Sequence, residues 1–360
     1  MGLHELQLRD FRIFQEFVFE PDHDAITVLL SPNGTGKTSV LEAVYALATA
    51  QSFRTNSASD MIRTNTGLAE AHGVVFQNGR RIQVDLTITR GLRNTTKRML
   101  VNGQRPKSRA ALSEALPLTV FTPEGVDIVR QGPEHRRSFL TNLLTDVDLS
   151  TGDVIERFNH VLTQRNALLR SFAGENPTGS QRAELETWDV EFCAASEHLI
   201  LARTATLDEL APLTSQFYQA LAQNNHVVDV TYERSWSGDL ERALKASFHD
   251  DRFRGYSTLG PQRDDIGLRL EGRDARRQAS QGEQRSLALA LRLAGHELVR
   301  QKRGLDPLLL LDDVFGELDP LRSDRLLQLL PVGQTLVTTS TPLPLGMSPA
   351  AIVDLTKVST

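Results

Sequence analysis

The segment S-P-N-G-T-G-K-T at residues 31–38 constrains the fold more than any other feature of this 360-residue chain. An apolar run, Ile26–Leu30, comes directly before it, and a helical stretch over residues 38–49 follows. In a strand, glycine-rich loop and helix in this order, the loop N–H groups converge on phosphate at the positive end of the helix dipole. The segment therefore predicts an α/β domain that holds a nucleoside triphosphate.

Individual side chains of this loop have separate predicted roles. Lys37 is expected to reach the β- and γ-phosphates, and the Thr38 hydroxyl is expected to bind Mg²⁺. Motifs of this kind usually open with glycine, and Ser31 stands in that place, whereas the G-T-G-K-T core is intact. The expected ATP-binding residues are Ser31, Pro32, Asn33, Gly34, Thr35, Gly36, Lys37, Thr38 and Ser39.

Two carboxylates follow a second apolar run, L-L-L-L-D-D at residues 308–313, which reads as a central parallel strand. Asp312 is expected to be a direct or outer-sphere Mg²⁺ ligand. Asp313 is expected on the opposite side of an extended chain, where it accepts a proton from the attacking water. Alone, such a pair is more often a turn or a helix N-cap. The following G-E-L-D-P, residues 316–320, is expected to form a tight loop near a subunit boundary.

A third segment, S-Q-G-E-Q, precedes a helix that is expected from Gly282 onward. Small residues at a helix start make a second anion site, although one triphosphate does not need two sites in one chain. We therefore expect these residues to bind the γ-phosphate of ATP held by another copy in a two-fold dimer. The alternative is a capping box between Ser280 and Glu283 with no intermolecular role. The segment comprises Ser280, Gln281, Gly282, Glu283 and Gln284.

Together these segments resemble the ATP-binding-cassette superfamily and, within it, the RecF recombination mediators, relatives of the heads of structural-maintenance-of-chromosomes proteins. Four further stretches carry the resemblance to RecF: residues 8–14, 121–140, 259–265 and 311–319. The resemblance implies an α/β P-loop ATPase head with a RecA-like mixed sheet and a second, mainly helical lobe without a long coiled coil. It assigns residues 1–122 and 303–360 to lobe I, and residues 123–302 to lobe II. Lobe II then contains S-Q-G-E-Q at residues 280–284, which the resemblance identifies as the signature segment.

The same resemblance implies an ATP-dependent DNA-binding protein of recombinational repair, replication and the SOS response. ATP·Mg²⁺ would drive dimerisation on DNA, and slow, DNA-stimulated hydrolysis with Asp313 and Lys37 as catalytic residues would release it. Double-stranded DNA, single-strand/double-strand junctions, RecR and RecO are the implied partners in loading a recombinase. A switch region would fall at residues 338–340, where no histidine is present, and Gln131 is a candidate for the glutamine loop. The alternative function is the ATP-binding subunit of a membrane transporter.

Secondary-structure patterns organise the rest of the chain. Alternating residues 73–76 and 81–89 around Asn78-Gly79 predict a hairpin beside the nucleotide-binding strand, and Asn102-Gly103 predicts another turn. Helical spacing over residues 154–169 and 184–222, with a turn at residues 174–180, predicts a short helical hairpin.

The net charge of −5 gives no overall attraction to DNA, so DNA binding requires local basic clusters. Such clusters are more often ordinary solvated faces than phosphate-binding tracks. One cysteine suits a reducing compartment, and the absence of a long apolar stretch or signal peptide favours the cytoplasm and no membrane association. The DNA-binding candidates are Arg105, Lys107, Arg130, Arg136, Arg137, Arg254 and Arg263.

Overall fold

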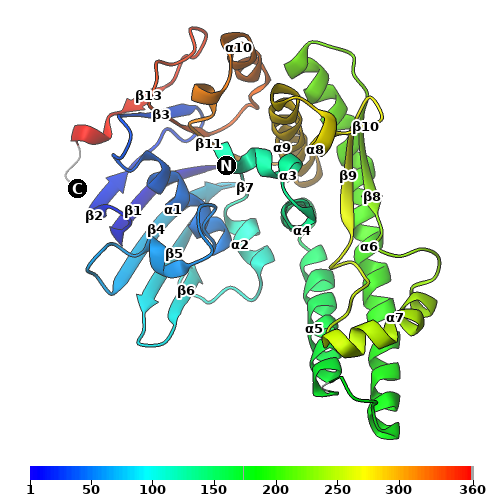
Figure 1. Cartoon of the computed structure of the whole chain (residues 1–360). Helices are drawn as coiled ribbons and strands as arrows, with labels where there is room; N and C mark the ends of the chain where they lie inside the picture. The colour runs from blue at the N-terminus through cyan, green and yellow to red at the C-terminus, as the bar shows by residue number, and fades with distance from the viewer. Residues whose placement is uncertain (173, 358–360) are drawn as a thin grey trace. The chain divides into compact units, whose positions relative to one another are not determined.

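The computed structural model describes residues 1–172 and 174–357, which form two compact units (Figure 1). Unit 1 comprises Met1–Val126, Phe217–Asn224 and the chain from Leu289 onward, and unit 2 comprises Asp127–Gln216 and Asn225–Ala288. The partition differs from the predicted lobes in segments that were expected in lobe II. The residues of helix α9 (Gln281–Arg303) from Leu289 onward and the segment Phe217–Asn224 both belong to unit 1.

A five-stranded sheet in unit 1 carries the nucleotide-binding motifs. Its order is β13-β3-β12-β11-β7, and each pair of neighbouring strands is parallel. Parallel strands place their carboxyl ends at one edge, so the segments that follow β3, β11 and β12 meet there. The strands are β3 (Ile26–Leu30), β7 (Leu118–Phe121), β11 (Leu308–Asp312), β12 (Thr335–Thr339) and β13 (Ala351–Val353).

A second, antiparallel sheet of unit 1 has the order β2-β1-β4-β5-β6. Its strands are β1 (Gly2–Phe11), β2 (Phe14–Phe19), β4 (Leu68–Gln77), β5 (Arg80–Arg90) and β6 (Thr95–Val101). The predicted hairpin is confirmed, since Gln77 pairs with Arg80 across Asn78 and Gly79, which have φ of 51° and 74°. Positive φ at both central residues is the requirement of a type I′ turn.

The expected position of this hairpin beside the nucleotide-binding strand is wrong. Strand β4 pairs with β1, whereas β3 has β12 on one side and β13 on the other. Because both edges of β3 are already hydrogen-bonded, the hairpin has no edge of β3 to join. The second predicted turn, at Asn102 and Gly103, is confirmed by the bridge between Val101 and Gln104.

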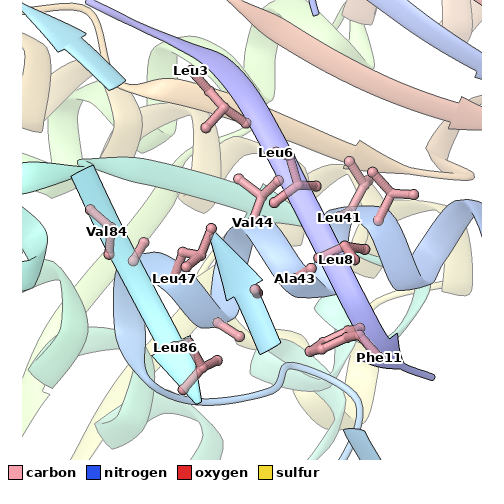
Figure 2. Close-up of a cluster of buried hydrophobic side chains, with 14 of the residues drawn as sticks. Leu3, Leu6, Leu8, Phe11, Leu41, Ala43, Val44, Leu47, Val84 and Leu86 are labelled. Atoms are coloured by element: carbon pink, nitrogen blue, oxygen red, sulfur yellow. The ribbon is translucent and has the colours of Figure 1, made fainter. Parts of the chain in front are cut away.

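Helix α1 (Lys37–Thr49) packs against the antiparallel sheet through an apolar face (Figure 2). Leu41, Val44 and Leu47 of this helix are fully buried, as are Leu6 of β1 and Val84 of β5. This packing holds the helix that follows the glycine-rich loop, and truncating one of its leucines to alanine costs about 2–5 kcal/mol. The other unit 1 elements are η1 (Ala58–Met61), α2 (Arg109–Ala115), η2 (Pro123–Val126), η3 (Val314–Glu317), α10 (Pro320–Leu329) and η4 (Leu355–Lys357).

Unit 2 contains most of the predicted helical hairpin, formed by α5 (Thr151–Ser171) and α6 (Gly179–Ala222); the end of α6 from Phe217 onward belongs to unit 1. It also contains a small antiparallel sheet, β10-β9-β8, which the sequence patterns did not indicate. The remaining elements are α3 (Asp127–Arg130), α4 (Pro133–Val147), β8 (Val228–Glu233), α7 (Leu240–Arg254), β9 (Asp265–Leu270), β10 (Arg273–Asp274) and α8 (Ala275–Gln278). In the described chain, no helix is both apolar enough and long enough to cross a lipid bilayer.

A buried histidine makes the stability of unit 1 pH-dependent. His296 of α9 is 2% exposed, its Nδ1 lies 3.2 Å from Thr119 Oγ1, and burial lowers its pKa from 6.5 to about 4. Between pH 6.5 and about pH 4, His296 is therefore mostly protonated in the unfolded chain and mostly neutral in the folded chain.

We expect the free energy of unfolding to fall by about 3 kcal/mol between pH 6.5 and pH 4 because of His296 alone. Urea denaturation across this range, compared with His296→Gln, isolates the effect because glutamine does not titrate. Equal pH dependence in the parent and the variant would contradict this assignment.

Candidate nucleotide site

The loop between β3 and α1 has the backbone geometry of a phosphate cradle. Gly34 and Gly36 have φ of 86° and 95°, in the left-handed region that favours glycine. A Cβ at Gly36 would lie 2.6 Å from Cζ of Phe14, so this position has no room for a side chain. Because α1 begins at Lys37, its free N–H groups and positive dipole end lie at the loop.

Lys37 is folded back onto this loop. Its Nζ donates to the carbonyl oxygens of Ser31 and Pro32 at 2.5 and 2.8 Å, and the residue is 6% exposed. Burial lowers the pKa of Lys37, while the nearby carboxylates of Asp313 and Asp312 oppose that shift. The ammonium group therefore lies among acceptors, beside the carboxylates at the end of β11.

Ser31, the departure from the usual motif, has a structural role of its own. Its hydroxyl accepts a hydrogen bond from the Leu355 N–H at 2.8 Å and lies 3.2 Å from Oδ1 of Asp354. The side chain thus ties the segment after β13 to the start of the loop. Glycine has no hydroxyl with which to make these contacts.

Asp312 lies at the point where the loop helix and two strands meet. Its Oδ1 accepts hydrogen bonds from Thr38 Oγ1 at 2.9 Å and from Thr338 Oγ1 at 2.6 Å. Burial raises the pKa of this carboxyl, and the two hydroxyl donors partly offset the shift. A hydroxyl and a carboxylate oxygen this close are the hard ligands that Mg²⁺ uses, so the residues fit the ion.

Asp313 differs from the prediction in its backbone conformation. Its φ of 48° and ψ of 27° are left-handed rather than extended, and it is the N-cap residue of η3. Its N–H donates to the carbonyl oxygen of Thr338 at 3.1 Å and to the Thr338 hydroxyl at 3.0 Å, which holds this turn. A non-glycine residue in this region costs about 1–3 kcal/mol and often marks a functional site.

The Asp313 side chain differs from that of Asp312 in its hydrogen bonding. Its Oδ1 is buried and has no hydrogen-bond partner in the part of the chain that the structure describes. The backbone of Gly316 lies close to the Asp313 carboxylate, since a Cβ at Gly316 would lie 3.2 Å from Asp313 Oδ1. The loop at residues 316–320 therefore leaves room for Asp313 and then enters α10, where Asp319 caps the helix by accepting from the Arg322 N–H at 3.0 Å.

Thr338 is a site residue whose role the sequence patterns did not reveal. The predicted polar switch region at residues 338–340 begins inside β12, which extends to Thr339. The parallel register pairs Thr338 with Asp312, so its hydroxyl contacts both aspartates. The predicted switch region includes this position, whereas its contacts with the two aspartates follow from the register between β11 and β12.

The capping box at Ser280 and Glu283 is present in unit 2. The Ser280 N–H donates to Glu283 Oε2 at 2.7 Å, and the Glu283 N–H donates to Ser280 Oγ at 3.3 Å. The bond that the Ser280 N–H donates to the carboxylate lowers the pKa of Glu283. Gln284 is buried and accepts from Nε of Arg130 at 2.9 Å, whereas Ser280 and Gln281 are exposed.

The predicted DNA-binding residues separate into three groups by exposure. Arg136 is 5% exposed and donates to both carboxylate oxygens of Asp265 at 2.7 and 2.8 Å, so its place among the DNA contacts was wrong. Its other amino group donates to the carbonyl oxygen of the glutamine-loop candidate Gln131 at 3.0 Å. Arg130 and Arg137 are half-buried, whereas Arg105, Lys107, Arg254 and Arg263 are exposed.

The two aspartates are expected to respond differently to amidation. Asp313→Asn removes the proton acceptor but leaves the Thr38 and Asp312 oxygens, so we expect normal ATP binding and at least about 100-fold slower hydrolysis. Asp312→Asn is expected to raise the Mg²⁺ concentration needed for ATP binding. Titrations of a fluorescent ATP analogue against Mg²⁺, together with single-turnover hydrolysis, measure both effects. Equal loss of nucleotide binding in the two variants would refute their separate roles.

Comparisons with known proteins match nearly the whole chain to RecF-type proteins. The family model described as RecF/RecN/SMC N terminal domain matches residues 2–342. A DNA replication and repair protein RecF from Acidothermus cellulolyticus is 34% identical over 355 residues, with 94% of each chain covered. Its counterpart from Halothermothrix orenii is 32% identical over 342 residues, covering 92% of this chain and 89% of that protein.

Solved structures show the same relationship. The recombination mediator protein RecF with ATP, from the RecFOR pathway, superposes with a TM-score of 0.88 at 25% identity and covers 98% of this chain and 94% of that one. An Smc head bound to the C-winged helix domain of ScpA has a TM-score of 0.53 at 15% identity, covering 95% and 90%. These likenesses confirm the predicted fold class, an α/β ATPase head with a second, largely helical lobe.

Proposed function

Because the chain belongs to the RecF family of DNA replication and repair proteins, we propose that it is a recombination mediator that binds ATP·Mg²⁺ and DNA. The observation that carries this proposal is the meeting of Thr38, Asp312 and Thr338 beside the glycine-rich loop. Next to them lies an Asp313 oxygen that has no hydrogen-bond partner among the described residues. ATP is the ligand named for the similar solved structure, and its triphosphate suits this loop.

Each residue of the site has a defined task in this proposal. Residues 31–39 hold the triphosphate, Thr38 and Asp312 hold Mg²⁺, and Lys37 exchanges its two carbonyl partners for phosphate oxygens. Bound Mg²⁺ supplies positive charge that neutralises the phosphate oxygens. Asp313 accepts the proton of the attacking water, so the protein hydrolyses ATP. This hydrolysis is proposed to be slow and to be stimulated by DNA.

The exposed signature residues complete the proposed site from a second copy of the chain. Ser280 and Gln281 lie at the start of the 23-residue helix α9, where a phosphate oxygen would meet free N–H groups. ATP would then join two copies on DNA, and hydrolysis would release them. The capping box is compatible with this role, because a serine hydroxyl can both accept from Glu283 N–H and donate to phosphate.

DNA and the other mediators are the proposed partners. The exposed candidates Arg105, Lys107, Arg254 and Arg263 would contact the phosphate backbone without reading sequence. RecR and RecO are proposed as protein partners because the similar ATP-bound structure belongs to the RecFOR pathway. The protein would act in the cytoplasm at double-stranded and junction DNA. The transporter alternative has no support among these relatives, which are replication and repair proteins.

Substituting Ser280 tests the shared nucleotide site. Ser280→Arg places a bulky cation where the partner's nucleotide is proposed to lie, so it should bind ATP normally yet stay monomeric. ATP-dependent retention on duplex DNA should be lost with the dimer, because dimerisation brings two basic surfaces together. Light scattering with and without ATP measures the association.

The matched control is Ser280→Ala, which removes the cap without adding bulk. It should lose about 1 kcal/mol of stability and still associate with ATP, although more weakly than the parent because one phosphate contact is lost. A normal ATP-induced dimer of Ser280→Arg would show that the capping box is the whole role of this segment.

A further inference from the structure

The segment that follows β13 is joined to the nucleotide loop through the hydroxyl group of Ser31. Strand β13 is an edge strand of the parallel sheet and pairs with β3 (Figure 1). Because parallel strands end at the same edge of a sheet, the chain after β13 lies beside the loop at residues 31–38. The family model matches residues 2–342, so the segment at residues 351–357 lies outside that match.

The main contact between the segment and the loop is buried. The N–H of Leu355 donates to Oγ of Ser31 at 2.8 Å, and the two residues are 2% and 5% exposed. The Leu355 side chain belongs to the same core cluster as the apolar face of α1. Without the serine hydroxyl, this buried N–H would lose its acceptor, which is costly away from water.

Asp354 lies at the same hydroxyl. Its Oδ1 is 3.2 Å from Ser31 Oγ, and it accepts from the Thr356 N–H at 3.0 Å and from the Thr356 hydroxyl at 2.7 Å. The Ser31 hydroxyl has a second acceptor, the carbonyl oxygen of Leu30 at 2.7 Å, and its one proton serves one acceptor at a time. Asp354 therefore has two possible roles, to hold Ser31 or to cap η4 alone, and these roles predict different results.

Ser31 connects the segment to the ammonium group of the nucleotide loop. While its hydroxyl contacts Leu355, its carbonyl oxygen accepts from Lys37 Nζ at 2.5 Å. A loop whose first residue is already fixed loses less conformational freedom when a ligand binds. Contacts that fix Ser31 therefore favour ATP binding without touching ATP.

We propose that Ser31, Asp354 and Leu355 form a clamp that positions the nucleotide loop for ATP, and that bound ATP in turn tightens the segment at residues 351–357. The proposal rests on the ATP-binding function above and adds this segment to it. Coupling of this kind is reciprocal, so the factor by which the clamp strengthens ATP binding is also the factor by which ATP strengthens the clamp. Asp354 is a positioning residue, because it acts on ATP through Ser31.

ATP affinity and turnover of Asp354 variants test the clamp on the full chain. Asp354→Ala should weaken binding of a fluorescent ATP analogue with Mg²⁺ by about 2- to 10-fold, the range for one hydrogen bond. The KM for ATP should rise, whereas kcat should stay at the parental value. Asp354→Asn should restore the affinity, because its amide oxygen also accepts a hydrogen bond. Asp208→Ala removes an exposed aspartate of α6 and should change none of these quantities.

A double variant distinguishes the clamp from capping of η4. If Asp354 acts through Ser31, the variant with both Ser31→Ala and Asp354→Ala should bind ATP no more weakly than Ser31→Ala alone. Losses that add in the double variant would overturn the proposal. Parental ATP affinity in Asp354→Ala would also overturn it and leave Asp354 as a cap.

Hydrogen exchange of the segment at residues 351–357 gives a second readout. In the parent, saturating ATP should slow this exchange, whereas in Ser31→Ala saturating ATP should leave it unchanged. An equal effect of ATP in both proteins would contradict the role of Ser31. Failure of the parent to bind ATP·Mg²⁺ would instead refute the proposed function, so the two failures are distinguishable.

Discussion

Lys37→Ala is expected to abolish ATP hydrolysis, with a loss of at least about 100-fold, and to prevent ATP-driven association. The Nζ of Lys37 donates hydrogen bonds to the carbonyl oxygens of Ser31 and Pro32. It also lies close to Asp312 and Asp313, so its removal leaves no ammonium group at the loop. Phosphate release and light scattering, each with ATP, measure the two losses.

The fold should survive this substitution, because α1 is held by its buried apolar face rather than by Lys37. The thermal unfolding midpoint without nucleotide checks this point. Lys245→Ala, which removes an exposed lysine of α7, is the matched control and should hydrolyse ATP at the parental rate. Parental hydrolysis by Lys37→Ala would mean that the cradle lies elsewhere.

Arg165→Ala is expected to lower the free energy of unfolding of unit 2 by about 3–5 kcal/mol. Arg165 of α5 is fully buried and donates to Asp189 of α6 at 2.8 Å and to Asp251 of α7 at 2.9 Å. Alanine would leave the 0% exposed Asp251 without its cation and would open a cavity between three helices.

Urea denaturation followed by tryptophan fluorescence measures this loss, because both tryptophans, Trp188 and Trp236, lie in unit 2. Arg157→Ala is the control, since Arg157 pairs with Glu191 across the same two helices, at 3.0 Å, but in solvent. It should cost at most about 1 kcal/mol. Similar losses in the two variants would show that burial of the Arg165 network adds nothing to stability.

Much of the local structure was predictable from short stretches of sequence. The strand at Ile26–Leu30, the helix after Gly36, the turn at Asn78-Gly79 and the Ser280–Glu283 capping box are all present. Their hydrogen bonds close within a few residues, so neighbouring side chains and backbone preferences suffice to specify them.

The identity of the family was also carried by sequence, in segments spread over most of the chain, and the comparisons confirm it. The residues at the nucleotide loop and at the end of β11 were recognisable because phosphate and Mg²⁺ each require particular atoms. Loop N–H groups, one ammonium group, one hydroxyl and a carboxylate are chemical requirements that sequence displays directly.

Only the tertiary structure decided how distant residues combine. Thr338 joins the two aspartates because β12 pairs with β11 in one register, and Asp313 is left-handed because Thr338 holds its N–H. The sequence suggested Arg136 as a DNA contact. In the folded chain its guanidinium group is instead paired with Asp265, which is far away in the sequence. Sequence determined which groups this protein possesses, whereas strand register and burial determined which of them face a ligand, because those depend on contacts between residues that are remote along the chain.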